Sequence, residues 1–88
     1  MFETVEIKDI KRELGTLVKA LRKQRGLSQT QLAESLDVSR TTIQNLEMGK
    51  NFTMDTILKV MKEMDLLTQL NSEILQAKRH IANSKSLY

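Results

Sequence analysis

The apolar positions of the chain recur three and four residues apart along most of its length, which is the spacing of one face of an α-helix. Breaks in this spacing divide the sequence into five segments, so we predict an all-α fold of five helices. The first helix is expected to run from Ile7 or Lys8 to Arg25, and the fifth to begin at about Leu67. The positions expected to face the core are Leu14, Leu17, Val18, Leu21, Leu32, Ala33, Leu36, Ile43, Leu46, Ile57, Leu58, Val60, Met61 and Met64.

Capping residues place the ends of these helices. Ser28, Ser39 and Thr53 each precede an apolar segment, as residues that cap helix N-termini do. Gly26 follows the basic turn KALRKQR and Gly49 follows QNLEM, so both are predicted C-terminal caps. The terminal stretches are less regular: FETVEI is either a short strand or an extended arm, and NSKSLY is expected to be frayed.

The stretch LAESLDVSRTTIQNLE joins two short helices with no glycine or proline between them. One helix ends near Leu36 and the next starts near Arg40, a connection too short for two helices lying side by side. It fits a steep crossing, as in a helix-turn-helix. Asp37 is expected to turn the chain at positive φ, because Asp is enriched in the left-handed region. Ala33 is small enough for the helix contact, and Val38 is expected to fill the turn.

The second of these helices is polar apart from Ile43 and Leu46. Solvent-exposed helical faces usually favour Lys and Glu, which are strong helix formers. This helix instead presents groups suited to hydrogen bonds with base edges and phosphates, so DNA contact is favoured over a plain solvent-exposed face. Its polar residues are Arg40, Thr41, Thr42, Gln44, Asn45 and Glu47.

The positive charge of the chain is concentrated in the same region. Residues 19–50 carry a net charge of +3, which equals that of the whole chain. A clustered basic surface is typical of phosphate binding, although a local excess this small also fits an ordinary solvated surface. The segment LVKALRKQR has the pattern of a basic amphipathic helix for a membrane or a partner protein, but its apolar face is needed for the core.

The composition argues against several other kinds of protein. The 88 residues are enough for one small domain, and an aromatic content of 3% predicts an aliphatic core. The absence of cysteine excludes disulfides and thiolate metal sites. With a single histidine, His80, and neither a phosphate loop nor paired carboxylates, we expect no enzyme, metal, cofactor or small-molecule ligand. No apolar run approaches the length of a membrane span, so we expect no membrane partner.

The stretch GLSQTQLAESLDVSRTTIQNLEMGK resembles the helix-turn-helix of XRE/Cro-type bacterial and phage regulators. The resemblance extends from about Leu14 to Leu67 and departs at Asp37, where the family often has glycine. The residues at the expected spacing are Gln29, Leu32, Ala33, Val38, Ser39, Ile43, Leu46, Glu47 and Gly49.

This resemblance implies a lambda-repressor-like domain in a cytoplasmic bacterial or phage protein. It implies a homodimer that binds a palindromic operator and represses transcription, with the helix from Ser39 in the major groove of double-stranded DNA. It also implies a structural ion pair between Arg22 and Glu47. The base-facing positions are Arg40, Thr41 and Asn45, with Gln44 and Ser39 beside them. The positions at the DNA backbone are Gln29, Thr42, Lys50 and Asn51.

The terminal segments leave room for a partner. We expect residues 1–12 to form an extension and the start of the first helix, residues 13–68 the helix-turn-helix domain, and residues 69–88 a C-terminal helix and tail. The apolar residues of the last helix form a stripe that is longer than one small core needs. Part of this stripe is therefore expected to dimerise and part to fold back on the first helix. The alternative function is an antitoxin of the HipB type, which binds a toxin protein and represses its own operon. The stripe consists of Leu66, Leu67, Leu70, Ile74, Ala77 and Ile81.

Overall fold

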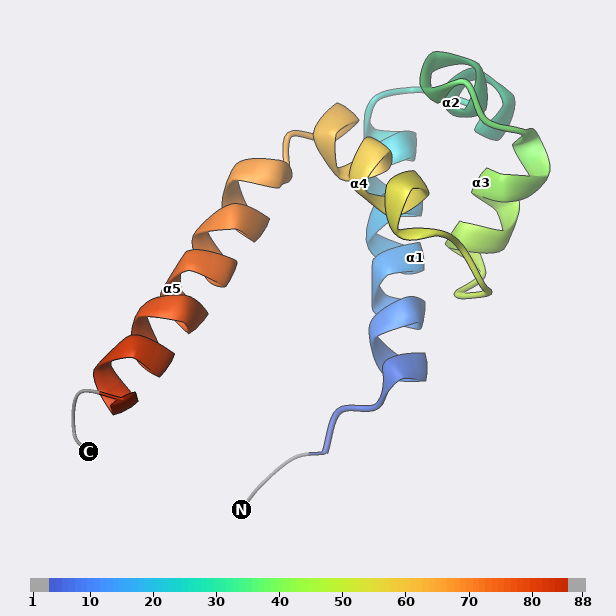
Figure 1. The fold of residues 1–88 in the computed structure, drawn as a ribbon. Helices are drawn as coiled ribbons and strands as arrows, with labels where there is room; N and C mark the ends of the chain where they lie inside the picture. Colours follow the sequence, from blue (N-terminus) through green and yellow to red (C-terminus); the bar gives the residue numbers. More distant parts are fainter. Residues whose placement is uncertain (1–3, 86–88) are drawn as a thin grey trace.

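Residues 4–85, the part of the chain that the computed structural model describes, form five α-helices and no β-strand (Figure 1). The predicted all-α class, the number of helices and their starting points are confirmed. In chain order the helices are α1 (Ile7–Gln24), α2 (Gln29–Leu36), α3 (Arg40–Glu47), α4 (Met54–Glu63) and α5 (Leu67–Lys85).

Hydroxyl side chains cap three of the helices as predicted. In each case the oxygen accepts a hydrogen bond from the backbone N–H three residues further on, which satisfies one of the amides left free at a helix start. These bonds join Ser28 to Gln31 at 3.0 Å, Ser39 to Thr42 at 3.1 Å and Thr53 to Thr56 at 3.1 Å. At α1 the cap is Glu6, whose N–H donates to Asp9 Oδ2 at 2.9 Å.

The core lies between α1, α2, α3 and α4, and all of its fully buried apolar residues come from these helices or their ends. Leu32, Ile43, Leu46 and Val60 are completely inaccessible to solvent. Partly buried side chains, among them Val38, pack around them. The other buried apolar residues are Val18, Ala33, Leu36, Ile57 and Met64.

The joint between α2 and α3 has the predicted geometry. Asp37 is left-handed, with φ of 56°, and the N–H of Val38 returns to the carbonyl of Ala33 at 3.0 Å. This bond closes the C-terminus of α2 before the chain enters α3. Gly26 and Gly49 also have positive φ, as expected of residues that end helices.

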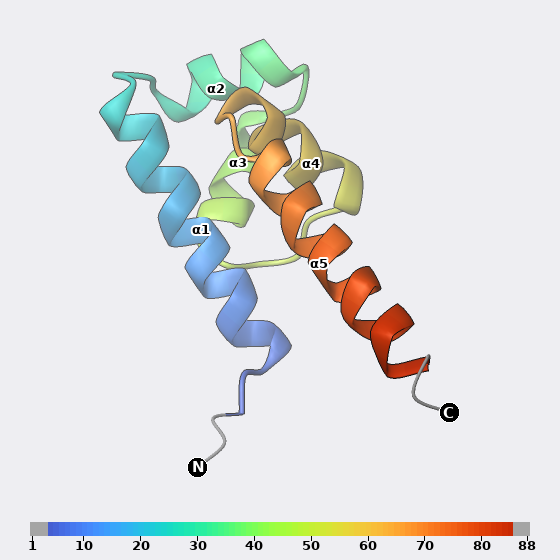
Figure 2. The same ribbon diagram turned by 90° about the vertical axis from the view of Figure 1, so that its left-hand side faces the viewer.

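The predicted stripe of α5 divides in two: Leu66 and Leu70 are partly buried and line a pocket together with Leu17 of α1, whereas the stripe from Ile74 onward does not fold back on α1. Helix α5 leaves α4 and runs along the same side of the molecule as α1: in Figure 1 the two helices diverge as the limbs of a V, and in Figure 2, turned by 90°, they run nearly parallel. Every side chain from residue 71 to residue 83 is exposed. Leu17, predicted to face the core, is also 41% exposed, because it lies on the side of α1 that faces the open V.

The C-terminal end differs from the sequence prediction, and the N-terminal end agrees with the extended-arm alternative where it is described. Helix α5 continues to Lys85, so the expected fraying at NSKSLY is wrong for residues 83–85, and residues 86–88 lie outside the described part. Residues 4–6 are neither helix nor strand, which removes the strand alternative there, while Phe2 and Glu3 are not described. Across residues 4–85, no helix combines the length and hydropathy needed to cross a bilayer.

Candidate nucleic-acid interface

Helix α3 is held by two apolar side chains on one face and presents polar groups on the other. Ile43 and Leu46 are completely buried. Arg40, Thr41 and Gln44 are exposed on the opposite side. Asn45 and Thr42 are partly buried at the margins of this face, and Met48, just past the helix, is 54% exposed. The structure therefore gathers the predicted base-facing residues on one accessible surface.

The first turn of α3 uses part of its hydrogen-bonding capacity internally. The hydroxyls of Ser39 and Thr42 lie 2.8 Å apart and bond to each other. The Ser39 oxygen also accepts the N–H of Thr42. One hydroxyl proton of the pair is thus already used, and one is left for an outside acceptor.

A buried ion pair fixes α3 to α1. Arg22 Nε lies 2.6 Å from Glu47 Oε2, and Arg22 Nη2 lies 3.0 Å from Glu47 Oε1, so the guanidinium and the carboxylate meet at two points. Gln29 Nε2 donates to the same Oε1 at 3.1 Å, and Arg22 Nη1 donates to the carbonyl of Leu27 at 2.9 Å. These bonds tie α1, the start of α2 and the end of α3 together. Gln29, predicted at the DNA backbone, therefore has its amide nitrogen directed at Glu47.

The ionisation of this pair follows from its surroundings. Burial by itself raises the pKa of Glu47, but the hydrogen bonds from Arg22 and Gln29 and the charges of Arg22 and Lys19 outweigh it, so the pKa is lowered. The hydrogen bond to Glu47 raises the pKa of Arg22, against the opposing effect of burial. Both side chains are therefore charged at neutral pH, and α3 is held by a full ion pair.

A glycine that sequence reasoning left without a role allows α3 to approach α1. A Cβ added at Gly15 would lie 2.5 Å from the carbonyl oxygen of Leu46 and 2.7 Å from that of Glu47. Such distances are below those of real contacts, so only glycine fits where the backbones of α1 and α3 meet. The sequence signal was a glycine inside a helical pattern, which usually has a packing reason.

The loop after α3 is also fastened to α1. Lys11 Nζ donates to Asn51 Oδ1 at 3.0 Å, across 40 positions of sequence. Gly49 is close to the backbone of Arg12, whose Cα would lie 3.1 Å from an added Cβ. Lys50 is exposed between these contacts. Lys11 was missed by the sequence analysis, because nothing local marks a lysine as the partner of a residue in a distant loop.

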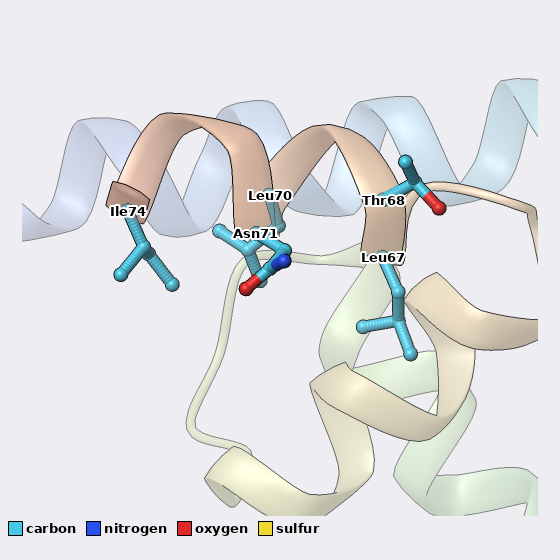
Figure 3. A pocket seen from close by; sticks show the side chains of 5 residues that line it. All are labelled: Leu67, Thr68, Leu70, Asn71 and Ile74. Atoms are coloured by element: carbon cyan, nitrogen blue, oxygen red, sulfur yellow. The ribbon is translucent and has the colours of Figure 1, made fainter. Parts of the chain in front are cut away.

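The surface pockets described below lie away from the polar face of α3. The pocket in Figure 3 is lined by side chains of α5, namely Leu67, Thr68, Leu70, Asn71 and Ile74. Among the described residues, no group of three or more His, Cys, Asp or Glu side chains is placed to hold a metal ion. The polar face of α3 is the exposed side of a helix, which suits a groove in a partner better than it suits a small ligand.

Comparison with known protein families gives a match to the family model described as helix-turn-helix, over residues 18–68. This region covers the second half of α1, all of α2, α3 and α4, and the first residues of α5. A search of curated proteins finds no match.

Proposed function

Because the chain belongs to the XRE/Cro-type helix-turn-helix family of DNA-binding transcription regulators, we propose that it is a cytoplasmic repressor. It binds a palindromic operator as a homodimer and places α3 in the major groove. The observation that carries this proposal is the outer face of α3. Arg40, Thr41 and Gln44 are exposed together on a short helix whose other face is anchored in the core.

The side chains of this face have the chemistry of base recognition. The guanidinium of Arg40 is able to donate two hydrogen bonds to O6 and N7 of guanine. The amides of Gln44 and Asn45 are able to read adenine in the same bidentate way, and the methyl group of Thr41 suits the methyl of thymine. Ser39 lies beside them at the start of the helix and offers a hydroxyl.

Residues at both ends of the motif are suited to the DNA backbone. Lys50 is exposed in the loop after α3, and Asn51 beside it is held by Lys11. Gln29 opens α2, and Thr42 lies in the first turn of α3. Contacts of this kind fix the orientation of a protein on the duplex without reading its sequence. The firm attachment of α3 by Arg22 and Glu47 gives the base-facing side chains a defined position.

The proposal is tested by binding to DNA from the promoter of the protein's own gene, compared with random DNA of equal length, at two salt concentrations. We expect a strong preference for the promoter that persists at the higher salt, with two protomers on each site. Equal and salt-sensitive binding to both DNAs would mean that the surface contacts only phosphates, and it would contradict the proposal.

A further inference from the structure

An apolar pocket lies between the first half of α1 and the start of α4, beside the loop that follows α3. This loop passes next to α1, as the bond between Lys11 and Asn51 requires (Figures 1 and 2). The pocket has a volume of about 380 Å³, within the range of about 300–1,000 Å³ that is typical of small-molecule sites. Its lining consists of Lys11 and six apolar side chains, those of Ile7, Ile10, Leu14, Phe52, Met54 and Ile57.

The apolar lining combines an inner part that belongs to the core with an exposed rim. Ile57 is one of the buried core residues. Ile7, Ile10 and Met54 are at least half exposed, although they are large and apolar. Apolar side chains that gather at one place on a surface generally mark a binding site. The fold leaves these three uncovered, so the molecule that covers them comes from outside.

Lys11 supplies a positive charge to this pocket. It is partly buried, whereas every other lysine whose burial is described is exposed. Its ammonium donates to the neutral oxygen Asn51 Oδ1 at 3.0 Å, and no carboxylate of residues 4–85 forms an ion pair with it. Its neighbours Lys8 and Arg12 are both paired with carboxylates. An ammonium has three N–H donors, so two remain for an anion in the pocket.

We propose that this pocket binds a small organic anion, whose apolar body lies among the six apolar side chains and whose carboxylate lies at the Lys11 ammonium. A single cation beside an apolar site matches one head group. It does not match the many charges of an acidic protein surface, because the other charged side chains of this part of α1 pair with one another. The sequence predicts no small-molecule ligand, and the pocket becomes visible only in the fold, which brings α1 and α4 together.

Lys11 also connects the pocket to the loop that is proposed to contact DNA. An ammonium only donates, so its partner in Asn51 is the amide oxygen, and the amide nitrogen is left to donate to a phosphate. A carboxylate is a stronger acceptor than a neutral amide, so a bound anion competes with Asn51 for the ammonium. It also places a negative charge beside the exposed Lys50. The anion should therefore weaken operator binding, and this part of the inference rests on the proposed function.

Binding of octanoate and octan-1-ol, which differ in the charge of the head group, tests the pocket without DNA. The isotope-labelled chain is titrated with each compound and followed by nuclear magnetic resonance. We expect the signals of Ile10, Met54 and the Asn51 side-chain amide to shift. We expect octanoate to bind about tenfold more tightly than octan-1-ol, because its head group gains a charge-assisted hydrogen bond. The absence of these shifts at octanoate concentrations below micelle formation would overturn the proposal.

Two pairs of variants assign the binding to this pocket. Lys11→Met should remove the preference for octanoate, whereas Lys8→Met, at an exposed position nearby, should keep it. Ile10→Gln should weaken the binding of both compounds. Its matched control is Ile74→Gln, an almost equally exposed position in the pocket of α5, which should weaken neither. Circular dichroism verifies that helix content is unchanged. A preference for octanoate that persists in Lys11→Met, or binding that is lost in Ile74→Gln, would contradict the assignment.

Operator binding tests the connection between the pocket and the loop. We expect saturating octanoate to weaken the binding of the wild type to its promoter DNA several-fold, and octan-1-ol to have little effect. Lys11→Met should respond alike to the two compounds, because it has no ammonium for the head group to take from Asn51. Promoter affinity that stays unchanged while octanoate occupies the pocket would refute the connection.

The outcomes separate this inference from the proposed function. Binding of octanoate at Lys11 by a chain that does not distinguish promoter from random DNA would leave the pocket standing and the repressor proposal refuted. A chain that prefers its promoter but shows no octanoate binding at Ile10 would refute the inference alone. Signals of Ile10 and Met54 that ignore octanoate, but broaden with chain concentration or with a co-expressed neighbouring protein, would assign the rim to a macromolecular partner and overturn the inference.

Discussion

The guanidinium of Arg22 and the carboxylate of Glu47 meet at two points, 2.6 and 3.0 Å apart, and join α1 to the last turn of α3. Both side chains are at least nine-tenths buried. Two further hydrogen bonds join Arg22 to the carbonyl of Leu27 and Glu47 to the side chain of Gln29. Across the described residues, no buried side-chain nitrogen or oxygen is left without a partner. The position of α3, and with it the face that carries Arg40, depends on this satisfied network.

Removing one partner of the pair should destabilise the fold strongly. Glu47→Ala leaves the Arg22 guanidinium buried without its counter-charge, and we expect a loss of about 3–5 kcal/mol in the free energy of unfolding. The measurement is urea denaturation followed by circular dichroism. Glu34→Ala, at an exposed position of α2, is the control and should change stability by less than about 0.5 kcal/mol. Equal effects of the two substitutions would mean that the ion pair contributes nothing.

The same pair should make stability depend on pH in the acidic range. The pKa of Glu47 is lower in the folded chain than its ordinary value of 4.5, so the unfolded chain binds the proton more readily. The contribution of the pair is therefore fully present above about pH 4.5 and is lost as the pH falls through the folded pKa. We expect the stability difference between wild type and Glu47→Gln to shrink on acidification. A constant difference across the acidic range would argue against this assignment.

Gly15→Ala should destabilise the protein although it improves helix propensity. In an exposed helix interior, replacing glycine by alanine stabilises by about 1 kcal/mol. Here the added methyl group would press on the carbonyl oxygens of Leu46 and Glu47, and we expect a net loss of about 1–3 kcal/mol. Thermal melts of Gly15→Ala and of Thr16→Ala, its exposed neighbour, provide the comparison. A more stable Gly15→Ala would show that α1 and α3 separate without cost.

The stability of variants at Asp37 should depend on how easily the new residue adopts a left-handed backbone conformation. Glycine adopts φ of 56° freely, whereas a β-branched residue is strained there. We expect Asp37→Gly to match the wild type or exceed it by up to about 1 kcal/mol, and Asp37→Val to lose about 2 kcal/mol. Chemical denaturation of both variants measures the difference. Similar stabilities for Gly and Val would mean that the turn relaxes to another conformation.

Substitutions at Arg40 and at Lys50 should distinguish contacts with DNA bases from contacts with the DNA backbone. Arg40→Ala should cost about 1–3 kcal/mol of binding and relax the preference at one base pair. Arg40→Lys, which keeps the charge but loses the bidentate geometry, should relax the same preference. Lys50→Ala should weaken binding to all sequences alike and lower the salt dependence. The test is to measure the affinity of each variant for a set of operators that differ at single base pairs. An equal loss of affinity for all of these operators in Arg40→Ala would indicate that Arg40 contacts a phosphate instead of a base.

Local patterns in the sequence were enough to predict much of the fold. The three hydroxyl caps and the left-handed Asp37 depend on interactions between residues close in the chain, and the apolar positions from Leu32 to Met64 follow from the helical spacing of the sequence. Such interactions repeat in many proteins, so residue type and spacing identify them. The exposed polar face of α3 follows from the same periodicity, because two buried anchors determine which side of a short helix is left outside.

Contacts between distant residues were decided only by the tertiary structure. The role of Gly15, the bond between Lys11 and Asn51, and the left-handed Asp65 held by Arg25 depend on how helices cross. The periodic stripe of α5 has the same appearance whether it folds onto α1 or faces outward. In the structure the residues of the stripe from Ile74 onward are exposed, and Arg25 at the end of α1 bonds to the turn that precedes α5. The sequence by itself therefore determined which residues are apolar and helical, and the packing of α1 against the rest decided which of them are buried in one chain.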